Sequence, residues 1–211
     1  MTAYSSLPRR AAALAAAAGA ALVLAACGSG SGDGSTGHGG HSSGSPKPST
    51  SAPAAQGEHN AADVAFSQGM IPHHRQAVEM ADLADTRAAS PEVKKLAAEI
   101  RKAQDPEIRT LSGWLTSWGE QVPEEGAADE HAGHSMSGMM TAGDMGKLEK
   151  SSGKEFDTAF LTMMVEHHEG AVEMARTEQA EGSYGPAKDM AGDIITSQSA
   201  EITRMNELLK G

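Results

Sequence analysis

A motif built around two adjacent histidines occurs twice in this chain. Residues 70–81 read Met-Ile-Pro-His-His-Arg-Gln-Ala-Val-Glu-Met-Ala, and residues 164–175 read Met-Val-Glu-His-His-Glu-Gly-Ala-Val-Glu-Met-Ala. An offset of 94 residues separates His73 from His167, and the same offset extends the match back to Asp63. The chain therefore contains a duplicated unit, and its fold must use that unit twice.

Each copy of the motif lies on one stripe of a predicted α-helix. The stripe residues recur at alternating intervals of four and three, which is the spacing of one helix face. They are Phe66, Met70, His73, Ala77 and Met80 in the first copy, and Phe160, Met164, His167, Ala171 and Met174 in the second. We expect the first helix to begin near Ala61 and to end near Ala89. Pro72 lies inside it and should either kink the helix or mark its first turn.

A second helix follows each copy. Ser90 and Pro91 form a helix-start signal, and the apolar stripe after them runs to about Trp118. The counterpart stripe runs over residues 186–209, so the whole helical hairpin is repeated. One hairpin cannot bury its stripe alone, whereas two can close around each other. The sequence therefore predicts an all-α fold, a four-helix bundle made of two duplicated helical hairpins.

Shifts in composition divide the chain into three parts. An N-terminal signal peptide, a Gly/Ser/Pro-rich tether and a folded domain are predicted at 1–26, 27–60 and 61–211. The domain divides into repeat 1 at 61–118, a Met/His-rich linker at 119–153 and repeat 2 at 154–210. The sequence leaves open whether the two hairpins pair within one chain or across a homo-oligomer.

The N-terminal segment indicates export. Arg9 and Arg10 precede an apolar run that ends at Ala26 and is too short to span a bilayer comfortably. Residues 24–27, Leu-Ala-Ala-Cys, resemble a bacterial lipobox, in which Cys27 would be lipidated, for example with palmitate. This predicts a protein anchored by lipid on the extracytoplasmic face of the cell membrane. The alternative is an uncleaved N-terminal anchor.

Charge and cysteine content argue against a nucleic-acid-binding protein and against a fold held by disulfides. The net charge of −11 argues against a nucleic acid partner, because phosphate binding needs a basic surface. A single cysteine allows no intramolecular disulfide, so the fold must depend on its apolar core.

The histidines and methionines of the repeated stripe suit a soft metal. Buried imidazole is costly unless its nitrogens have partners, and thioether sulfur selects Cu(I). A mixed set outside the cytoplasm therefore indicates copper, with Cu(I) favoured. The alternative is an ordinary core, because methionine fills helical cores readily and core histidines often form only hydrogen bonds. The candidate ligands are Met70, His73, His74, Met80, Met164, His167, His168 and Met174.

The linker carries a second group of candidate ligands. His131, His134, Met136, Met139 and Met140 lie close enough in sequence to chelate a metal without a fold, although a solvated linker would look the same. In the helices, Glu79 and Glu173 are rotated away from the histidine stripe, and we interpret them as surface or capping groups. This disfavours a carboxylate-bridged di-iron site.

The doubled motif resembles the signature of a bacterial family, the DUF305 family. The resemblance covers roughly residues 61–210 and implies a ferritin-like four-helix bundle. It also implies extracytoplasmic copper binding by the eight candidate ligands named above. One departure is Pro72, which precedes the first histidine pair where Glu166 precedes the second.

These observations predict a lipid-anchored protein that captures or buffers copper or confers copper resistance. They assign it no catalytic step. Two alternatives stay open. One is a cuprous-oxidase enzyme, which would need an open coordination position. The other is a structural or partner-binding bundle with inert core histidines.

Overall fold

The computed structural model of the protein describes residues 57–124 and 137–211. Its helices are α1 (Ala61–Arg87), α2 (Pro91–Trp118), α3 (Ala142–Lys150), α4 (Gly153–Glu181) and α5 (Gly185–Leu209). Over these ranges no β-strand forms, and one isolated bridge pairs Ala88 with Gly153. Among the described helices, none is both long and apolar enough to cross a membrane.

The long helices begin and end close to the predicted positions. Asn60 caps α1 and forms a reciprocal capping box with Asp63, while the Ser90 hydroxyl accepts hydrogen bonds at the start of α2. Of the two roles expected for Pro72, the structure excludes that of marking the first turn, because α1 begins at Ala61 and runs through Pro72. The first helix also ends at Arg87, slightly earlier than expected.

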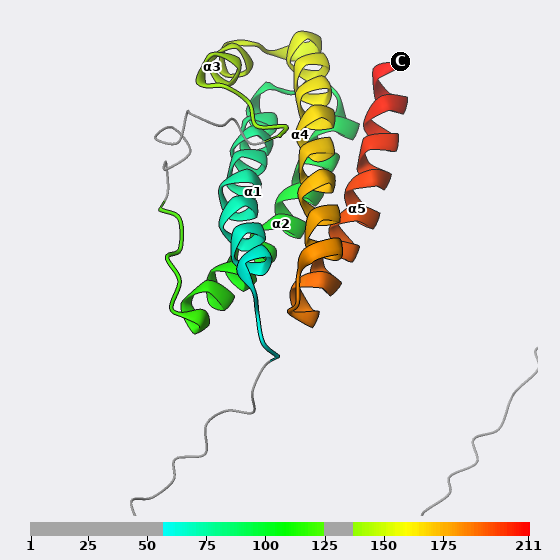
Figure 1. Ribbon diagram of the computed structural model, residues 1–211. Coiled ribbons are helices and arrows are strands. Elements are labelled where there is room, and N and C mark those ends of the chain that lie inside the picture. Colours follow the sequence, from blue (N-terminus) through cyan, green and yellow to red (C-terminus); the bar gives the residue numbers. More distant parts are fainter. Residues whose placement is uncertain (1–56, 125–136) are drawn as a thin grey trace, which may run out of the picture. The chain divides into compact units, whose positions relative to one another are not determined.

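The two hairpins pack through their histidine-bearing helices. Helix α1 packs against its partner α2 and against α4, and α4 packs against its own partner α5 (Figure 1). The fold is an all-α bundle, and the two hairpins meet within one chain.

The bundle core is divided into two apolar clusters. One joins the second half of α1 to the first half of α4 through residues such as Ala77, Met80 and Met164. The other joins the first half of α1 to the second half of α4 through residues such as Met70 and Ala171. The two clusters contain the residues before and after the histidines on each helix, so a layer of polar side chains lies between the clusters. We call it the polar layer; it consists of His73, His74, Gln104 and Glu107 and their counterparts His167, His168, Gln198 and Glu201.

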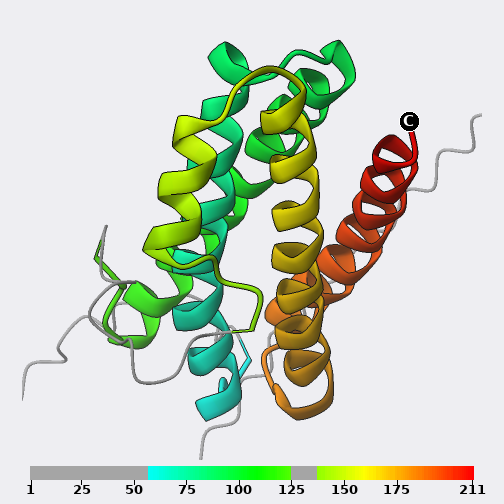
Figure 2. The same ribbon diagram turned by 90° about the horizontal axis from the view of Figure 1, so that it is seen from above.

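The predicted linker at 119–153 contains a helix that the sequence interpretation missed. Helix α3 buries Met145 and Leu148 in the cluster that holds Met80. It lies beside α1 and the beginning of α4 (Figure 2). The sequence does not indicate this helix, because it is glycine-rich and because only two residues of the helix face the core. Met145 is therefore a core residue.

Each hairpin caps the turn of the other. The Asp63 carboxylate in α1 accepts hydrogen bonds from the backbone N–H groups of Ser183 and Tyr184, at the start of α5. At the same offset of 94, Asp157 in α4 accepts from Ala89 and Ser90, at the start of α2. These buried carboxylates hold the hairpins in a fixed register, because unpaired N–H groups at a helix start are costly inside a protein.

Candidate metal centre

The polar layer is centred on one histidine from each repeat. The rings of His73 in α1 and His167 in α4 have centroids 3.8 Å apart and planes tilted by 43°. Both side chains are fully buried. The helical stripe that carries the apolar core thus brings its two histidines into direct contact.

Burial keeps this central pair neutral. Desolvation, with a smaller electrostatic effect from the neighbouring His74, lowers the pKa of His73 to about 3. Desolvation and the neighbouring His73 also lower the pKa of His167 well below its usual value. At neutral pH each ring therefore carries a lone pair on one nitrogen, which is the form that binds a metal.

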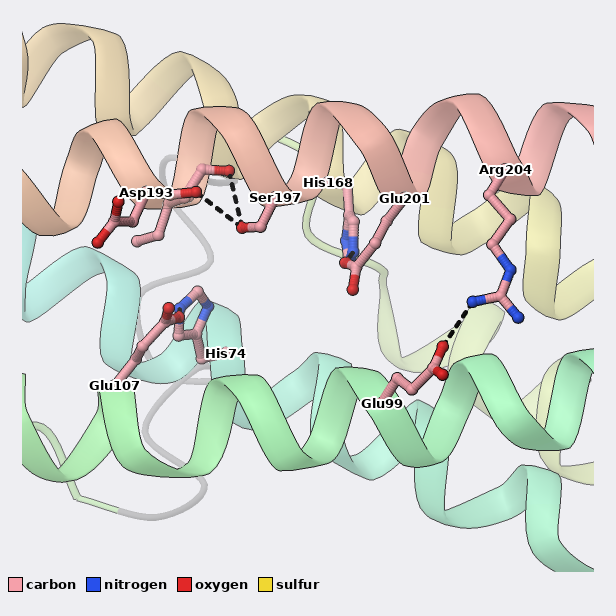
Figure 3. Close-up of polar contacts among 9 residues, drawn as sticks. His74, Glu99, Glu107, His168, Asp193, Ser197, Glu201 and Arg204 are labelled. Atoms are coloured by element: carbon pink, nitrogen blue, oxygen red, sulfur yellow. Dashed lines mark hydrogen bonds and ion pairs between the residues drawn. The ribbon is translucent and has the colours of Figure 1, made fainter. Parts of the chain in front are cut away.

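The second histidine of each pair contacts a glutamate of its own hairpin. His74 Nε2 lies 2.7 Å from Glu107 Oε2, and His168 Nε2 lies 2.7 Å from Glu201 Oε2. Figure 3 shows both pairs between α2 and α5, displaced from each other along the helices. Both imidazoles are fully buried, whereas each glutamate side chain is 22% exposed. The layer therefore reaches from the bundle centre to its surface.

Several polar atoms in this layer have no hydrogen-bond partner among the described residues. Gln104 and Gln198, one turn before the two glutamates, are buried in α2 and α5. The buried atoms without a partner are the Nδ1 atoms of His73, His74 and His168, both ring nitrogens of His167, and the Oε1 atoms of Gln104 and Gln198. Such a group in an apolar core costs free energy unless a ligand or water satisfies it.

Methionines flank the layer on both sides. Met70, Met80 and Met164 are fully buried, whereas Met174 is only partly buried. Met70 and Met174 pack in one apolar cluster, and Met80 and Met164 pack in the other. The structure therefore distributes the four predicted sulfur ligands over both sides of the histidines.

The residues present fit a soft metal better than a hard one. Nowhere in the described ranges do three or more His, Cys, Asp or Glu side chains converge closely enough to hold a metal ion. A metal in this layer would therefore need methionine sulfur or glutamine oxygen beside imidazole nitrogen. Thioether and imidazole together suit copper, and especially Cu(I).

A short piece of the linker covers the central histidines. We call Ser137–Met140 the strap. The Ser137 carbonyl oxygen lies 3.3 Å from His73 Nε2, and its hydroxyl donates to Glu173. The side-chain amide of Gln76 donates to the Met140 carbonyl and accepts from the Met140 N–H. These contacts fix the strap across α1 and α4.

The strap needs glycine on both sides of its contact with α4. Gly138 has a φ of 81°, which favours glycine, and a β-carbon there would lie 2.7 Å from the Glu166 carbonyl oxygen. A β-carbon at Gly170 would lie 2.0 Å from the Ser137 carbonyl oxygen. The backbone of the strap therefore rests directly on the backbone of α4.

The predicted linker ligands fall into two groups. His131, His134 and Met136 lie outside the described residues, as does Cys27. Met139 and Met140 belong to the strap and are partly buried, and Met140 packs against the apolar core. Core packing is therefore one role of Met140.

Sequence reasoning missed four residues of the polar layer. Glu107 and Gln104 in α2, with their counterparts Glu201 and Gln198 in α5, were not among the predicted ligands. The signal was available, because the offset of 94 relates both pairs.

One further buried carboxyl lies away from this layer. Glu178 in α4 is almost fully buried near Asp63. Desolvation, together with a hydrogen bond and repulsion from Asp63, raises the pKa of Glu178 to about 8. Burial also opposes ionisation of Asp63, but hydrogen bonds from Asn60, Glu178 and the α5 turn outweigh it and lower the Asp63 pKa.

Comparison with known proteins identifies relatives of this bundle. The family described as "Domain of unknown function (DUF305)" matches residues 63–209. No curated protein sequence gave a match. A crystal structure of a DUF305 protein from Streptomyces coelicolor, described as secreted, is similar with 34% identity and a TM-score of 0.64. The match covers 71% of this chain and 92% of that one.

A second set of similar structures carries metal. The protein CopM in its Cu(I)-bound form is 32% identical, with a TM-score of 0.58, over 70% of this chain and 95% of that one. The Cu(II)-bound form of CopM gives the same identity, coverage and TM-score.

Proposed function

The chain belongs to the DUF305 family, and we propose that it is a copper-binding protein that acts outside the cytoplasm. The observation that carries this proposal is the buried polar layer. Histidine nitrogens and glutamine oxygens without partners lie there between methionines of both repeats. A bound metal would satisfy several of these atoms at once.

The proposed ligands are drawn from the eight candidate residues of the repeated motif, namely the histidine pairs and the methionines on either side of them. His73 and His167 would form the centre of the site, because their rings are in contact and neutral. Met70 and Met174 on one side, and Met80 and Met164 on the other, would supply sulfur. Bound copper would be held as cargo, and we propose capture or buffering with no catalytic step. CopM, solved with Cu(I) and with Cu(II), supports the choice of metal.

We also propose attachment to the membrane by lipid at Cys27. The support is the lipobox-like sequence at residues 24–27, together with the secreted relative from Streptomyces coelicolor. Growth with a labelled fatty acid should label the parent chain, and changing Cys27 to alanine should abolish the label. A parent chain without label in the membrane fraction would contradict lipidation and favour the uncleaved anchor.

The test of copper binding is an anaerobic titration of Cu(I) against a competing chelator. It uses the chain without residues 1–27, all of which lie outside the described residues. A core variant changes His73 and His167 to alanine, and a linker variant changes His131, His134 and Met136 to alanine. Circular dichroism checks that each variant is folded.

The outcomes separate the proposed site from its alternatives. We expect the core variant to lose the tightest copper site and the linker variant to keep it. Copper at 100 times the dissociation constant should raise the stability of the parent chain by about 2.7 kcal/mol. Loss of the tight site only in the linker variant would assign copper capture to the linker. No binding by the parent chain would leave a bundle with inert core histidines.

A further inference from the structure

The two His–Glu pairs of the polar layer have the same geometry. His74 and His168 each direct Nε2 at a glutamate oxygen 2.7 Å away. The glutamates come from α2 and α5, and the offset of 94 relates both the histidines and the glutamates. The repeats differ at the two positions immediately after the histidines, Arg75-Gln76 against Glu169-Gly170. The two repeats thus share the His–Glu contact, although they differ at positions next to its histidine.

The partner of each Nε2 atom decides which nitrogen carries the proton. An ionised carboxylate only accepts hydrogen bonds, so a neutral imidazole must donate through Nε2–H. The proton is then absent from Nδ1, which keeps its lone pair. In both histidines Nδ1 is buried and has no hydrogen-bond partner among the described residues. A proton on Nδ1 would add a buried donor without an acceptor, which is costly.

The central histidine of repeat 1 follows the same rule. Its Nε2 faces the carbonyl oxygen of Ser137, which also only accepts, and its Nδ1 has no partner among the described residues. In their neutral forms His73, His74 and His168 therefore all carry the proton on Nε2 and the lone pair on Nδ1.

We propose that Glu107 and Glu201 are positioning residues that make His74 and His168 metal ligands through Nδ1. The inference rests on the proposed copper site. Each carboxylate fixes the ring orientation and the position of the proton, and it makes the opposite nitrogen a stronger electron donor. The glutamates themselves do not touch the metal. The site thereby extends into α2 and α5, so that all four long helices contribute to it.

The first measurement uses metal-free protein. Long-range 1H–15N spectra of labelled protein report which nitrogen of each histidine carries the proton. We expect the Nε2–H form for His74 and His168 in the parent chain, and a mixture of forms in the double variant Glu107→Gln, Glu201→Gln, because an amide can donate as well as accept. Adding Ag(I), a diamagnetic substitute for Cu(I), should shift the Nδ1 resonances of both histidines in the parent chain.

The second measurement compares copper affinities. Loss of such a supporting carboxylate typically weakens metal binding about tenfold to hundredfold, and we expect this range for the double variant. The matched control is Glu99→Gln, Asp193→Asn. This control variant also removes one negative charge from α2 and one from α5, at two positions that the offset of 94 relates. Neither position is a histidine partner in the polar layer, and Glu99 instead forms an ion pair with Arg204. The control should bind copper within about twofold of the parent chain, because exposed charges have weak effects.

The results distinguish this inference from the proposed function. Protons on Nδ1 of His74 and His168 in the parent chain would overturn the inference, even with copper bound in the core. An unchanged copper affinity in the double variant would also overturn it. If the core variant His73→Ala, His167→Ala loses copper in that case, the proposed function stands without the positioning role. No copper binding by the parent chain would overturn both.

Discussion

The hairpins α1–α2 and α4–α5 are alike where they face each other and different where they face the linker. Both contribute a histidine pair, a buried glutamine, a glutamate on the second histidine and an aspartate that caps the other hairpin. Where the strap crosses, Gln76 in α1 corresponds to Gly170 in α4. The Gln76 side chain forms hydrogen bonds with the strap backbone, whereas Gly170 has no side chain and so leaves space for that backbone.

The two ends of the bundle differ for the same reason. Helix α3 packs on the cluster that contains Met80, which is fully buried. Met174, at the equivalent position in the second repeat, lies in the other cluster and is partly exposed. Glu178 replaces the small Ala84 of the first repeat and meets the carboxylate of Asp63. A single linker cannot satisfy two equivalent surfaces, so the positions that meet it have diverged.

Asp63 and Asp157, by which each hairpin caps the turn of the other, are called the exchanged caps. Their removal should have the largest effect on stability. Asp63→Ala leaves the N–H groups of Asn60, Ser183 and Tyr184 without their acceptor, and Asp157→Ala leaves two such groups. We expect losses of about 3–5 and about 2–3 kcal/mol in the free energy of unfolding, measured in urea. The exposed Asp105→Ala is the control. Equal, small losses in all three variants would show that the caps do not join the hairpins.

The contact between the strap and α4 can be broken with one methyl group. Gly170→Ala places a β-carbon against the Ser137 carbonyl, so the strap must move and about 1–3 kcal/mol should be lost. Hydrogen exchange at the Met140 N–H, which Gln76 protects, should become faster. Gly113→Ala in α2 meets open space and should instead stabilise by about 0.5–1 kcal/mol. Slow exchange at Met140 in Gly170→Ala would contradict the contact.

The buried carboxyl of the second repeat should make stability depend on pH. The folded pKa of Glu178, about 8, lies above its ordinary value of 4.5. The folded state therefore holds a proton that the unfolded state releases, and stability is lost as pH rises from 4.5 towards 8. Glu178→Gln should remove this loss and gain on the order of 1–2 kcal/mol at pH 8, but little at pH 4.5. Parallel curves of unfolding free energy against pH would contradict the shifted pKa.

The smallest effect should come from an ion pair that only the first hairpin has. Arg101 in α2 binds Asp82 and Asp85 in α1, and its counterpart in α5 is Ile195. Arg101→Ala should cost about 0.5–1 kcal/mol at low salt and less in 1 M salt, because the aspartates are exposed and screened. A loss that does not depend on salt would indicate packing by the arginine stem instead.

The duplication made the fold and the centre of the site predictable. A stripe with alternating spacings of four and three placed His73 and His167 on buried faces, and the structure shows that these two faces meet within one chain. The DUF305 resemblance, stated from the same motif, is confirmed by the family match. The assignment of the stripe residues as ligands stays a prediction.

Other parts of the site had a weaker sequence signal or none. The offset of 94 relates Glu107 to Glu201, but only the contact of Glu107 with His74 shows its role. The strap and α3 lie in glycine-rich sequence without periodicity, so their docking depends on tertiary contacts alone. Local pattern predicts which face is buried, but it does not predict what a linker will touch.

The exchanged caps have a consequence for the history of the chain. A single hairpin cannot cap its own turn in this way, but two identical hairpins could cap each other, because the bonds are reciprocal. A symmetric dimer of one hairpin would therefore be a complete structure. Joining the two copies in one chain removes the dependence of such an assembly on protein concentration. It also frees each half to change by itself, so one ancestral surface could become Gln76 in one half and Gly170 in the other.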